Sequence, residues 1–372
     1  MSGFLIIVAI AAACIVLGAV GFAWWFSRRT QSNGVTVDVE RLLADGRYDA
    51  AKDVAISALS VETDQAECFD LRICLARALV GEEDYQAAER VCREAADFAP
   101  ASRQRADALV EIARVQALAG ELDAASETLQ SVSPMACSAD GRGRRELAIA
   151  DIALTRLRFA EAERALAAAY DPSQSAEIAD DVALAHARLQ YLRGNFRQAI
   201  AETTRLLDRF KNEDSLSLTL LTLARALLDQ ERPEPVEADR ALSKALVLVH
   251  FPGYASVVSA CHALVQAHFD NEKEALESAD RASKLCVSSR FAAEAECLIG
   301  DAMRQFGRYV EARKHYQKAL GLDAGSLEAL WGLATCAQMT GLYQVAEPYF
   351  KLCIEAAPEH FLGRRSEDAI EG

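Results

Sequence analysis

The stretch LARAL occupies residues 75–79 and recurs, unchanged, at residues 223–227. The two copies lie 148 residues apart, which is four periods of 37. Around the first copy, Ala76 and Ala88 form a pair of small residues, and similar pairs recur along the chain. They are Val39/Ala51, Ala76/Ala88, Ala113/Ala125, Ala150/Ala162, Ala187/Ala199, Ala224/Ala238, Ala263/Ala275, Gly300/Ala312 and Ala334/Ala346. The second members mostly lie 37 residues apart, so the sequence predicts nine repeats in register.

Each repeat has the pattern of two helices joined by a tight turn. In several repeats a glycine and an aromatic residue separate the two small residues, as in Gly46 and Tyr48 or Gly194 and Phe196. Glycine ends a helix readily because it adopts the left-handed conformation without strain. Another small or aliphatic residue follows seven positions after each second alanine and lies on the same helical face. We therefore expect a helical hairpin whose two helices cross at the pair of small residues.

These repeats resemble tetratricopeptide repeats over about residues 36–360. The last repeat, residues 327–360, shows the resemblance best, and its matching positions are Leu330, Leu333, Ala334, Gly341, Tyr343, Ala346, Phe350 and Pro358. The family's period is 34, whereas most repeats here are 37 residues long. The resemblance implies an all-α fold, a right-handed solenoid of about nine helical hairpins. It also implies that the chain binds proteins, with no catalysis and no cofactor.

The arginine of LARAL falls at a position that faces the concave side of such solenoids. Arginines occupy the same position in four repeats, at Arg77, Arg114, Arg188 and Arg225. If they form a ladder along the groove, they suit an acidic peptide, because guanidinium groups pair with carboxylates in two-point geometry. The alternative is that each arginine pairs with Asp or Glu from a neighbouring repeat.

The N-terminal segment reads as a membrane anchor. Residues 4–26 contain no charge, and a helix of that length matches the bilayer core of about 30 Å. Arg28 and Arg29 follow directly, and no Lys or Arg precedes the segment. The positive-inside rule then places the N-terminus outside and the body in the cytoplasm. We expect a transmembrane anchor over residues 1–27, a linker over 28–35, the solenoid over 36–360 and a polar tail over 361–372.

Charge and cysteine content narrow the function further. The net charge of −15 repels phosphate backbones, so nucleic acid is not an expected partner. The ten cysteines show no CxxC spacing, and we expect free thiols in a reducing compartment. The best metal candidates are His250, Cys261, His262 and His268, but their spacing does not suit one site. The stretch DGRGRRE, residues 140–146, is a candidate anion-binding loop or an ordinary solvated loop.

The end of the array presents a further candidate surface. Residues 361–372 look too short and polar to cap the last hairpin, so we expect an exposed apolar patch there. Tyr349, Leu352 and Ile354 are its expected members, and a second copy of the chain or a membrane partner would cover it. The alternative is that the tail, with Phe361 and Leu362, folds back over the hairpin.

Together these observations favour a single-pass membrane protein whose solenoid recruits or organises partner proteins at the cytoplasmic face. One alternative places the array on the outer, periplasmic side, in envelope assembly or secretion. A second alternative is an enzyme with an unrecognised site, although no phosphate-binding loop, nucleophile elbow or HExxH motif is present.

Overall fold

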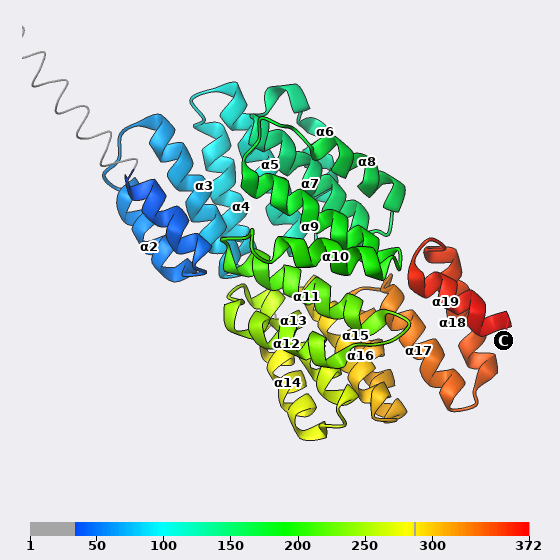
Figure 1. Ribbon diagram of the computed structural model, residues 1–372. Coiled ribbons are helices and arrows are strands. Elements are labelled where there is room, and N and C mark those ends of the chain that lie inside the picture. The colour runs from blue at the N-terminus through cyan, green and yellow to red at the C-terminus, as the bar shows by residue number, and fades with distance from the viewer. Residues whose placement is uncertain (1–33, 286–287, 372) are drawn as a thin grey trace, which may run out of the picture.

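The computed structural model describes residues 34–285 and 288–371, and these residues form an array of helical hairpins without any strand (Figure 1). A helix over residues 34–44 pairs with α2 (Tyr48–Leu59). The following hairpins are α3 (Gln65–Gly81) with α4 (Tyr85–Asp97), α5 (Ser102–Ala119) with α6 (Leu122–Ser131), α7 (Ala139–Thr155) with α8 (Phe159–Ala169), α9 (Ala176–Leu192) with α10 (Phe196–Leu206), α11 (Glu213–Asp229) with α12 (Pro235–Leu248), α13 (Pro252–His268) with α14 (Glu272–Leu285), α15 (Ser289–Gln305) with α16 (Tyr309–Leu322), and α17 (Leu327–Met339) with α18 (Tyr343–Ala356). A short 3-10 helix, η1 (Pro134–Ala136), precedes α7, and α19 (Phe361–Glu371) ends the chain. The expected all-α array of hairpins, resembling a tetratricopeptide-repeat solenoid, is confirmed over this part of the chain.

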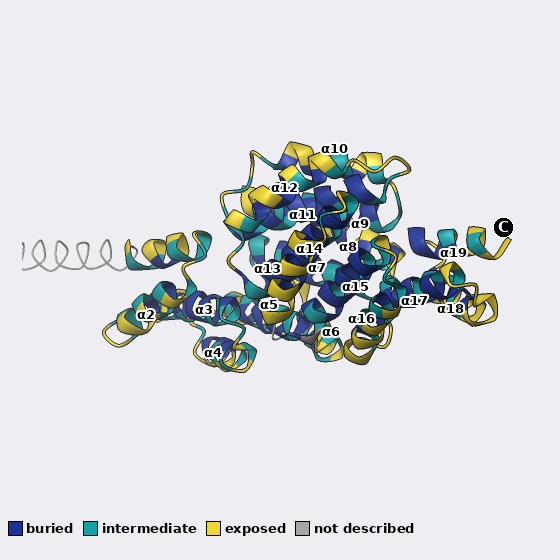
Figure 2. Cartoon of the chain, turned by 90° about the horizontal axis from the view of Figure 1, so that it is seen from below, coloured by how far each residue is buried: buried dark blue, intermediate teal, exposed yellow. Residues whose placement is uncertain are grey.

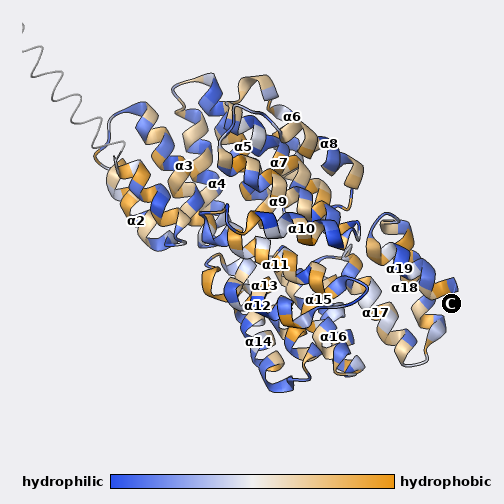
Figure 3. Cartoon of the chain, in the orientation of Figure 1, coloured by the Kyte–Doolittle hydropathy of each residue, from blue (hydrophilic) through white to orange (hydrophobic). Residues whose placement is uncertain are grey.

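The small residues lie where the two helices of a hairpin cross. Every alanine of the predicted pairs is at most 2% exposed, as is Val39. Gly300 shows why the position must be small, because a Cβ there would come within 2.6 Å of the Tyr316 ring. Tyr316 itself is completely buried. The hydrophobic core therefore runs through the crossings, from one hairpin into the next, and hydrophobic and hydrophilic residues alternate along nearly every helix (Figure 3).

In eight of the nine described hairpins, the turn holds one residue in the left-handed backbone region. Glycine supplies it five times, at Gly46, Gly120, Gly194, Gly307 and Gly341, with φ between 65° and 94°. Three other hairpins use Glu83, Leu157 and Asp270 at the equivalent position, with φ of 56° to 58°. The left-handed turn geometry therefore also occurs in hairpins that have no glycine at this position. A side chain in this region carries a conformational cost that glycine avoids.

Two expectations about segments differ from the structure. The stretch 140–146 is not a loop, because it forms the first two turns of α7, which Ser138 caps by accepting from the Gly141 amide at 2.9 Å. Residues 361–371, expected as a polar tail, form helix α19 with Phe361, Leu362 and Ser366 buried, which fits the alternative that the tail folds back. The anchor segment, residues 1–27, lies outside the described residues. Among the residues that are described, no helix is both long and apolar enough to cross a bilayer.

Candidate functional site

The array curls until hairpins far apart in sequence touch one another. Near the start, the Tyr48 hydroxyl donates a hydrogen bond to the Asp214 carboxylate, joining α2 to α11. A Cβ on Gly46 would overlap the His250 ring, so only glycine fits this contact. Further along, Ser288 Oγ donates to the Leu118 carbonyl at 3.2 Å and links α5 to the start of α15. Figures 1 and 2 show the early and late hairpins lying against each other.

A third contact of this kind involves α19. The Phe361 ring lies 5.6 Å from the Tyr191 ring and 5.3 Å from the Phe196 ring, measured between centroids. Arg365 Nη2 donates to the Asp229 carbonyl at 2.5 Å. The C-terminal helix therefore packs on α18 and also reaches the turn between α9 and α10 and the C-terminal end of α11 (Figure 1).

The first two arginines of the predicted ladder converge on one carboxylate. Glu111, only 6% exposed, accepts from Arg77 at 2.8 Å and from Arg114 at 2.9 Å. Arg144 approaches the same carboxylate at 3.9 Å from α7. Burial would raise the pKa of Glu111, but the arginines prevail and hold it well below its usual range. This cluster crosses three successive hairpins and joins their inner helices electrostatically.

The other two arginines of the ladder are paired as well. Arg188 donates to Asp151 of the preceding hairpin at 2.9 Å. Arg225 is bonded to Glu294 and lies 3.9 Å from Glu328, in hairpins two and three repeats later. All four arginines contact carboxylates of this chain, but only Arg77 and Arg188 pair with a neighbouring repeat, as the alternative interpretation expects. Arg114 pairs within its own helix, and Arg225 pairs with more distant repeats. Whether they also bind an acidic peptide is a separate hypothesis.

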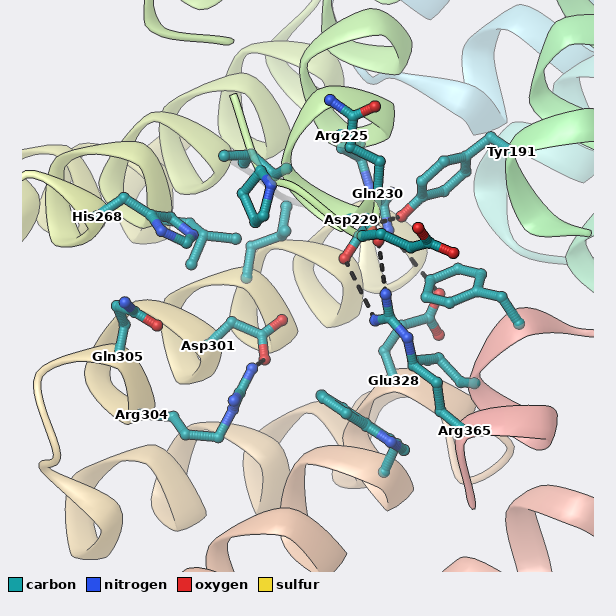
Figure 4. A pocket seen from close by; sticks show the side chains of 18 residues that line it. Tyr191, Arg225, Asp229, Gln230, His268, Asp301, Arg304, Gln305, Glu328 and Arg365 are labelled. Atoms are coloured by element: carbon teal, nitrogen blue, oxygen red, sulfur yellow. Dashed lines mark hydrogen bonds and ion pairs between the residues drawn. The ribbon is translucent and has the colours of Figure 1, made fainter. Parts of the chain in front are cut away.

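A cavity of about 330 Å³ lies on the inner side, between the C-terminal hairpins and α19 (Figure 4). Charged, aromatic and aliphatic side chains line it. Its lining is Tyr191, Arg225, Leu228, Asp229, Gln230, Glu231, Pro233, Leu264, His268, Leu298, Asp301, Arg304, Gln305, Glu328, Trp331, Phe361, Leu362 and Arg365. The lining comes from α9, α11, the α11–α12 turn, α13, α15, α17 and α19, so the cavity exists only because these elements curl around it.

Each arginine of the cavity lies over an aromatic ring. Arg225 is 5.0 Å from the centroid of the Tyr191 ring, Arg304 is 5.0 Å from that of Trp331, and Arg365 is 5.0 Å from that of Phe361. Such stacking leaves the edge of a guanidinium free to bind carboxylates. Arg304 uses it to bind Asp301 at 2.9 Å.

Two carboxylates of the cavity, Asp229 and Glu328, have pKa values that burial raises. Burial raises the pKa of Asp229, although the Tyr191 hydroxyl, which donates to it at 2.7 Å, and Arg225 oppose this. Burial also raises the pKa of Glu328, with Arg225 again opposing. A cation entering the cavity would therefore meet carboxylates that gain from a further positive neighbour.

The residues considered for a metal site do not converge. His262 lies inside its hairpin, with Nδ1 2.8 Å from Ser278 Oγ, and His250 instead contacts Glu213 at 2.7 Å. His268 lines the cavity, whereas Cys261 is buried in the core. Within residues 34–285 and 288–371, no three His, Cys, Asp or Glu side chains are grouped suitably for a metal ion. The eight cysteines described in the structure are free.

The structure also shows the surroundings of the predicted anion site and of the predicted end patch. In the segment 140–146, Arg142 binds Asp171 at 2.7 Å and Arg145 binds Glu146, so these arginines already hold carboxylates.

At the end of the array, Leu352 is 47% exposed, while Tyr349 and Ile354 are partly buried. Tyr349 packs against the cluster that Ala369 of α19 joins.

Arg225 was predicted as a site residue, but sequence reasoning missed most of the other residues that line the cavity. Asp229 closes α11 and Arg365 lies in a segment interpreted as a tail, so neither falls at a consensus position of a repeat. Glu111 was also missed, although it lies three residues before Arg114 on the same helix. The spacing of Phe361, Arg364 and Arg365 on one helical face is the signal that could have been noticed.

Comparison with known proteins adds little beyond the fold. No family model matches the sequence, and no curated protein matches it. Similar solved structures include MamA, at 23% identity over 46% of this chain and 93% of that one, with a TM-score of 0.29. The Cut9–Hcn1 hetero-tetramer of the APC/C matches at 17% identity over 87% of this chain and 79% of that one, with a TM-score of 0.37. A monomeric IFIT1 mutant with m7Gppp-AAAA matches at 15% identity over 75% of this chain and 67% of that one, with a TM-score of 0.44. At such values the partners of these proteins are not transferred to this chain.

Proposed function

We propose that this chain is a membrane-anchored scaffold whose solenoid recruits or organises partner proteins, and that it is not an enzyme. The observation that carries the proposal is the seat of α19, which consists of Tyr191, Arg193 and Phe196 around the α9–α10 turn and Asp229 at the end of α11. There the first turn of a helix inserts an aromatic ring and two arginines between hairpins far away in sequence. A surface that holds a segment of its own chain by side-chain contacts has the chemistry to hold a segment of another protein.

The resemblance to tetratricopeptide repeats supports protein partners independently of the cavity. Stacked hairpins present a long curved surface on a framework in which each unit is supported by its neighbours. An acidic peptide on the arginine ladder would have to replace Glu111, Asp151 and Glu294, which already occupy the arginines. Self-association through Leu352 remains a second way for the array to organise proteins.

The membrane part of the proposal rests on the sequence of residues 4–26. Those 23 residues carry no charge and precede Arg28 and Arg29. The array begins soon afterwards, with helix already formed at residue 34, so it would be held close to the bilayer. We propose that the body lies on the cytoplasmic side, and the alternative places it in the periplasm.

A thiol-labelling experiment separates the two orientations. The native cysteines are poor reporters, because seven of the eight described are buried and burial raises the pKa of Cys74 to about 11 and that of Cys92 to about 12. A Ser60→Cys variant provides an exposed thiol. An impermeant maleimide should label it only after the membrane is permeabilised. Labelling in intact cells would place the body outside.

Site-specific photo-crosslinking in cells tests the scaffold function. A photoreactive residue replaces Gln305 at the cavity, and the matched control carries it at Lys273, which is exposed on α14. We expect discrete crosslinked partner proteins from position 305 and not from position 273. Identical products from both positions, or none from either, would oppose a protein-binding groove on the inner side.

A further inference from the structure

The first turn of α19 lies in its seat as a bound peptide would. Phe361, 6% exposed, inserts against Tyr191 and Phe196 and joins a cluster that draws on α9, α10, α11 and α17. Ring-to-ring contacts of this kind supply apolar burial together with a preferred orientation. An aromatic side chain is thus the first element that the seat accepts.

Two arginines complete the contact at the ends of two helices. Arg364 donates from Nη2 to the carbonyl of Arg193, directly after α9, and Arg365 donates from Nη2 to the carbonyl of Asp229, the last residue of α11. Arg365 Nη1 also lies 3.9 Å from the Asp229 carboxylate. The last carbonyls of a helix lack intrahelical partners and form the negative end of its dipole, so they favour cations.

The charge of the seat selects for a basic partner. Apart from the residues of α19, the cavity is lined by the carboxylates of Asp229, Glu231, Asp301 and Glu328 and by only two arginines, Arg225 and Arg304. Both of these arginines already contact carboxylates (Figure 4). A cationic segment is therefore favoured at this end of the groove.

The seat is held by one turn of α19 alone. The rest of that helix packs on α18 and α17, and Arg364 is exposed to solvent. Exposed charge contacts are individually weak, and the apolar burial that Phe361 loses on displacement is regained by the aromatic residue of a competing segment. The exchange therefore costs little net free energy.

Resting on the scaffold function proposed above, we propose that this seat recognises helical segments of partner proteins that carry an aromatic residue followed, three and four positions later, by two arginines. Residues 361–365 have this pattern and fill the seat when no partner is bound. The i, i+3, i+4 spacing places all three side chains on one helical face, as in other helix-in-groove complexes. The partner class is thus basic and aromatic, in contrast to the acidic peptide that the arginine ladder suggests.

The test uses the full-length chain in nanodiscs and a fluorescent peptide spanning residues 357–372. The chain carries Arg365→Glu, which weakens its own α19 and leaves the seat intact. We expect the peptide to bind this variant about tenfold more tightly than it binds the wild-type chain. A matched peptide with both Arg364→Glu and Arg365→Glu should not bind. Equal binding of the two peptides, or no binding of either, would overturn the proposal.

A second readout needs no change in α19. In the wild-type chain, saturating wild-type peptide should speed hydrogen exchange of the amides over residues 361–366, and the double-glutamate peptide should leave it unchanged. In a chain with Asp229→Asn, the wild-type peptide should cause a smaller increase in hydrogen exchange over residues 361–366. Unchanged exchange with the wild-type peptide contradicts the proposal. If partners still crosslink at position 305 in that case, the scaffold function stands and only this partner class is wrong.

Discussion

The hydroxyl of Tyr48 donates a hydrogen bond to the carboxylate of Asp214, which lies 166 residues later in the chain. The same carboxylate accepts from the amides of His250 at 2.8 Å and Phe251 at 2.9 Å. Asp214 is 7% exposed, so each of these contacts is shielded from water. One side chain therefore fastens the first described hairpin to the sixth and, at the same time, orders the start of the seventh.

Asp214→Ala should lower the free energy of unfolding by about 2–3 kcal/mol, because it leaves buried amide donors and the Tyr48 hydroxyl without their acceptor. Tyr48→Phe removes a single hydrogen bond and should cost about 1 kcal/mol. Urea unfolding followed by circular dichroism measures both values. Equal costs for the two variants would mean that the amide contacts of Asp214 contribute nothing.

Ala162→Phe should destabilise the array by about 1–3 kcal/mol, because Ala162 is completely buried at a helix crossing and a larger side chain must push α7 and α8 apart. Ala160→Phe, on the exposed side of the same helix, is the matched control and should be nearly neutral. Hydrogen exchange should show the loss of protection first in the neighbouring hairpins. Uniform loss across the whole array would indicate a single globular core instead.

Gly307→Ala and Gly321→Ala should change stability in opposite directions. Neither added Cβ meets another atom within 4 Å, so the difference is purely conformational. Gly307 has a φ of 73°, which costs alanine about 1 kcal/mol, whereas Gly321 lies in the last turn of helix α16, where alanine gains about 0.5 kcal/mol. Thermal melts should give a lower melting temperature for Gly307→Ala and a higher one for Gly321→Ala than for the wild-type chain. Changes of the same sign in both variants would contradict the turn geometry.

Asp181→Asn should stabilise the protein at pH 8 and leave it unchanged at pH 4. Burial, opposed by Arg114, raises the pKa of Asp181 to about 7. The folded state then holds a proton that the unfolded state has lost, so stability falls as pH rises from about 4 to 7. The variant removes that fall, worth about 1–2 kcal/mol after allowance for solvent contact. Denaturant titrations at pH 4 and pH 8 measure the free energy of unfolding of both chains. If the wild-type chain and the variant differ by the same amount at both pH values, the raised pKa of Asp181 is contradicted.

The hairpins could be predicted from the sequence because their determinants are local. The spacing of Ala76 and Ala88, repeated along the chain, fixes where two helices cross, whatever lies outside the hairpin. The left-handed turn residues were only partly predictable, since Glu83, Leu157 and Asp270 adopt a conformation that their residue types do not signal.

The cavity could not be predicted because it depends on how far the array curls. A small rotation between successive hairpins, summed over several repeats, decides whether Tyr48 reaches Asp214 or Phe361 reaches Tyr191. No single position carries that information. The helix over residues 361–371 could not be predicted for the same reason, since Phe361 and Leu362 find partners on hairpins far away in the sequence.

The distance between α10 and α19 tests the central claim, that the array closes on its own C-terminal helix, most directly. Spin labels at Arg197→Cys and Glu367→Cys occupy exposed positions on the two helices, in a full-length chain whose Cys14, Cys68 and Cys286 are replaced by serine. Double electron–electron resonance should give one narrow distance distribution for the free protein. A broad distribution, with the two helices free to separate, would contradict the account.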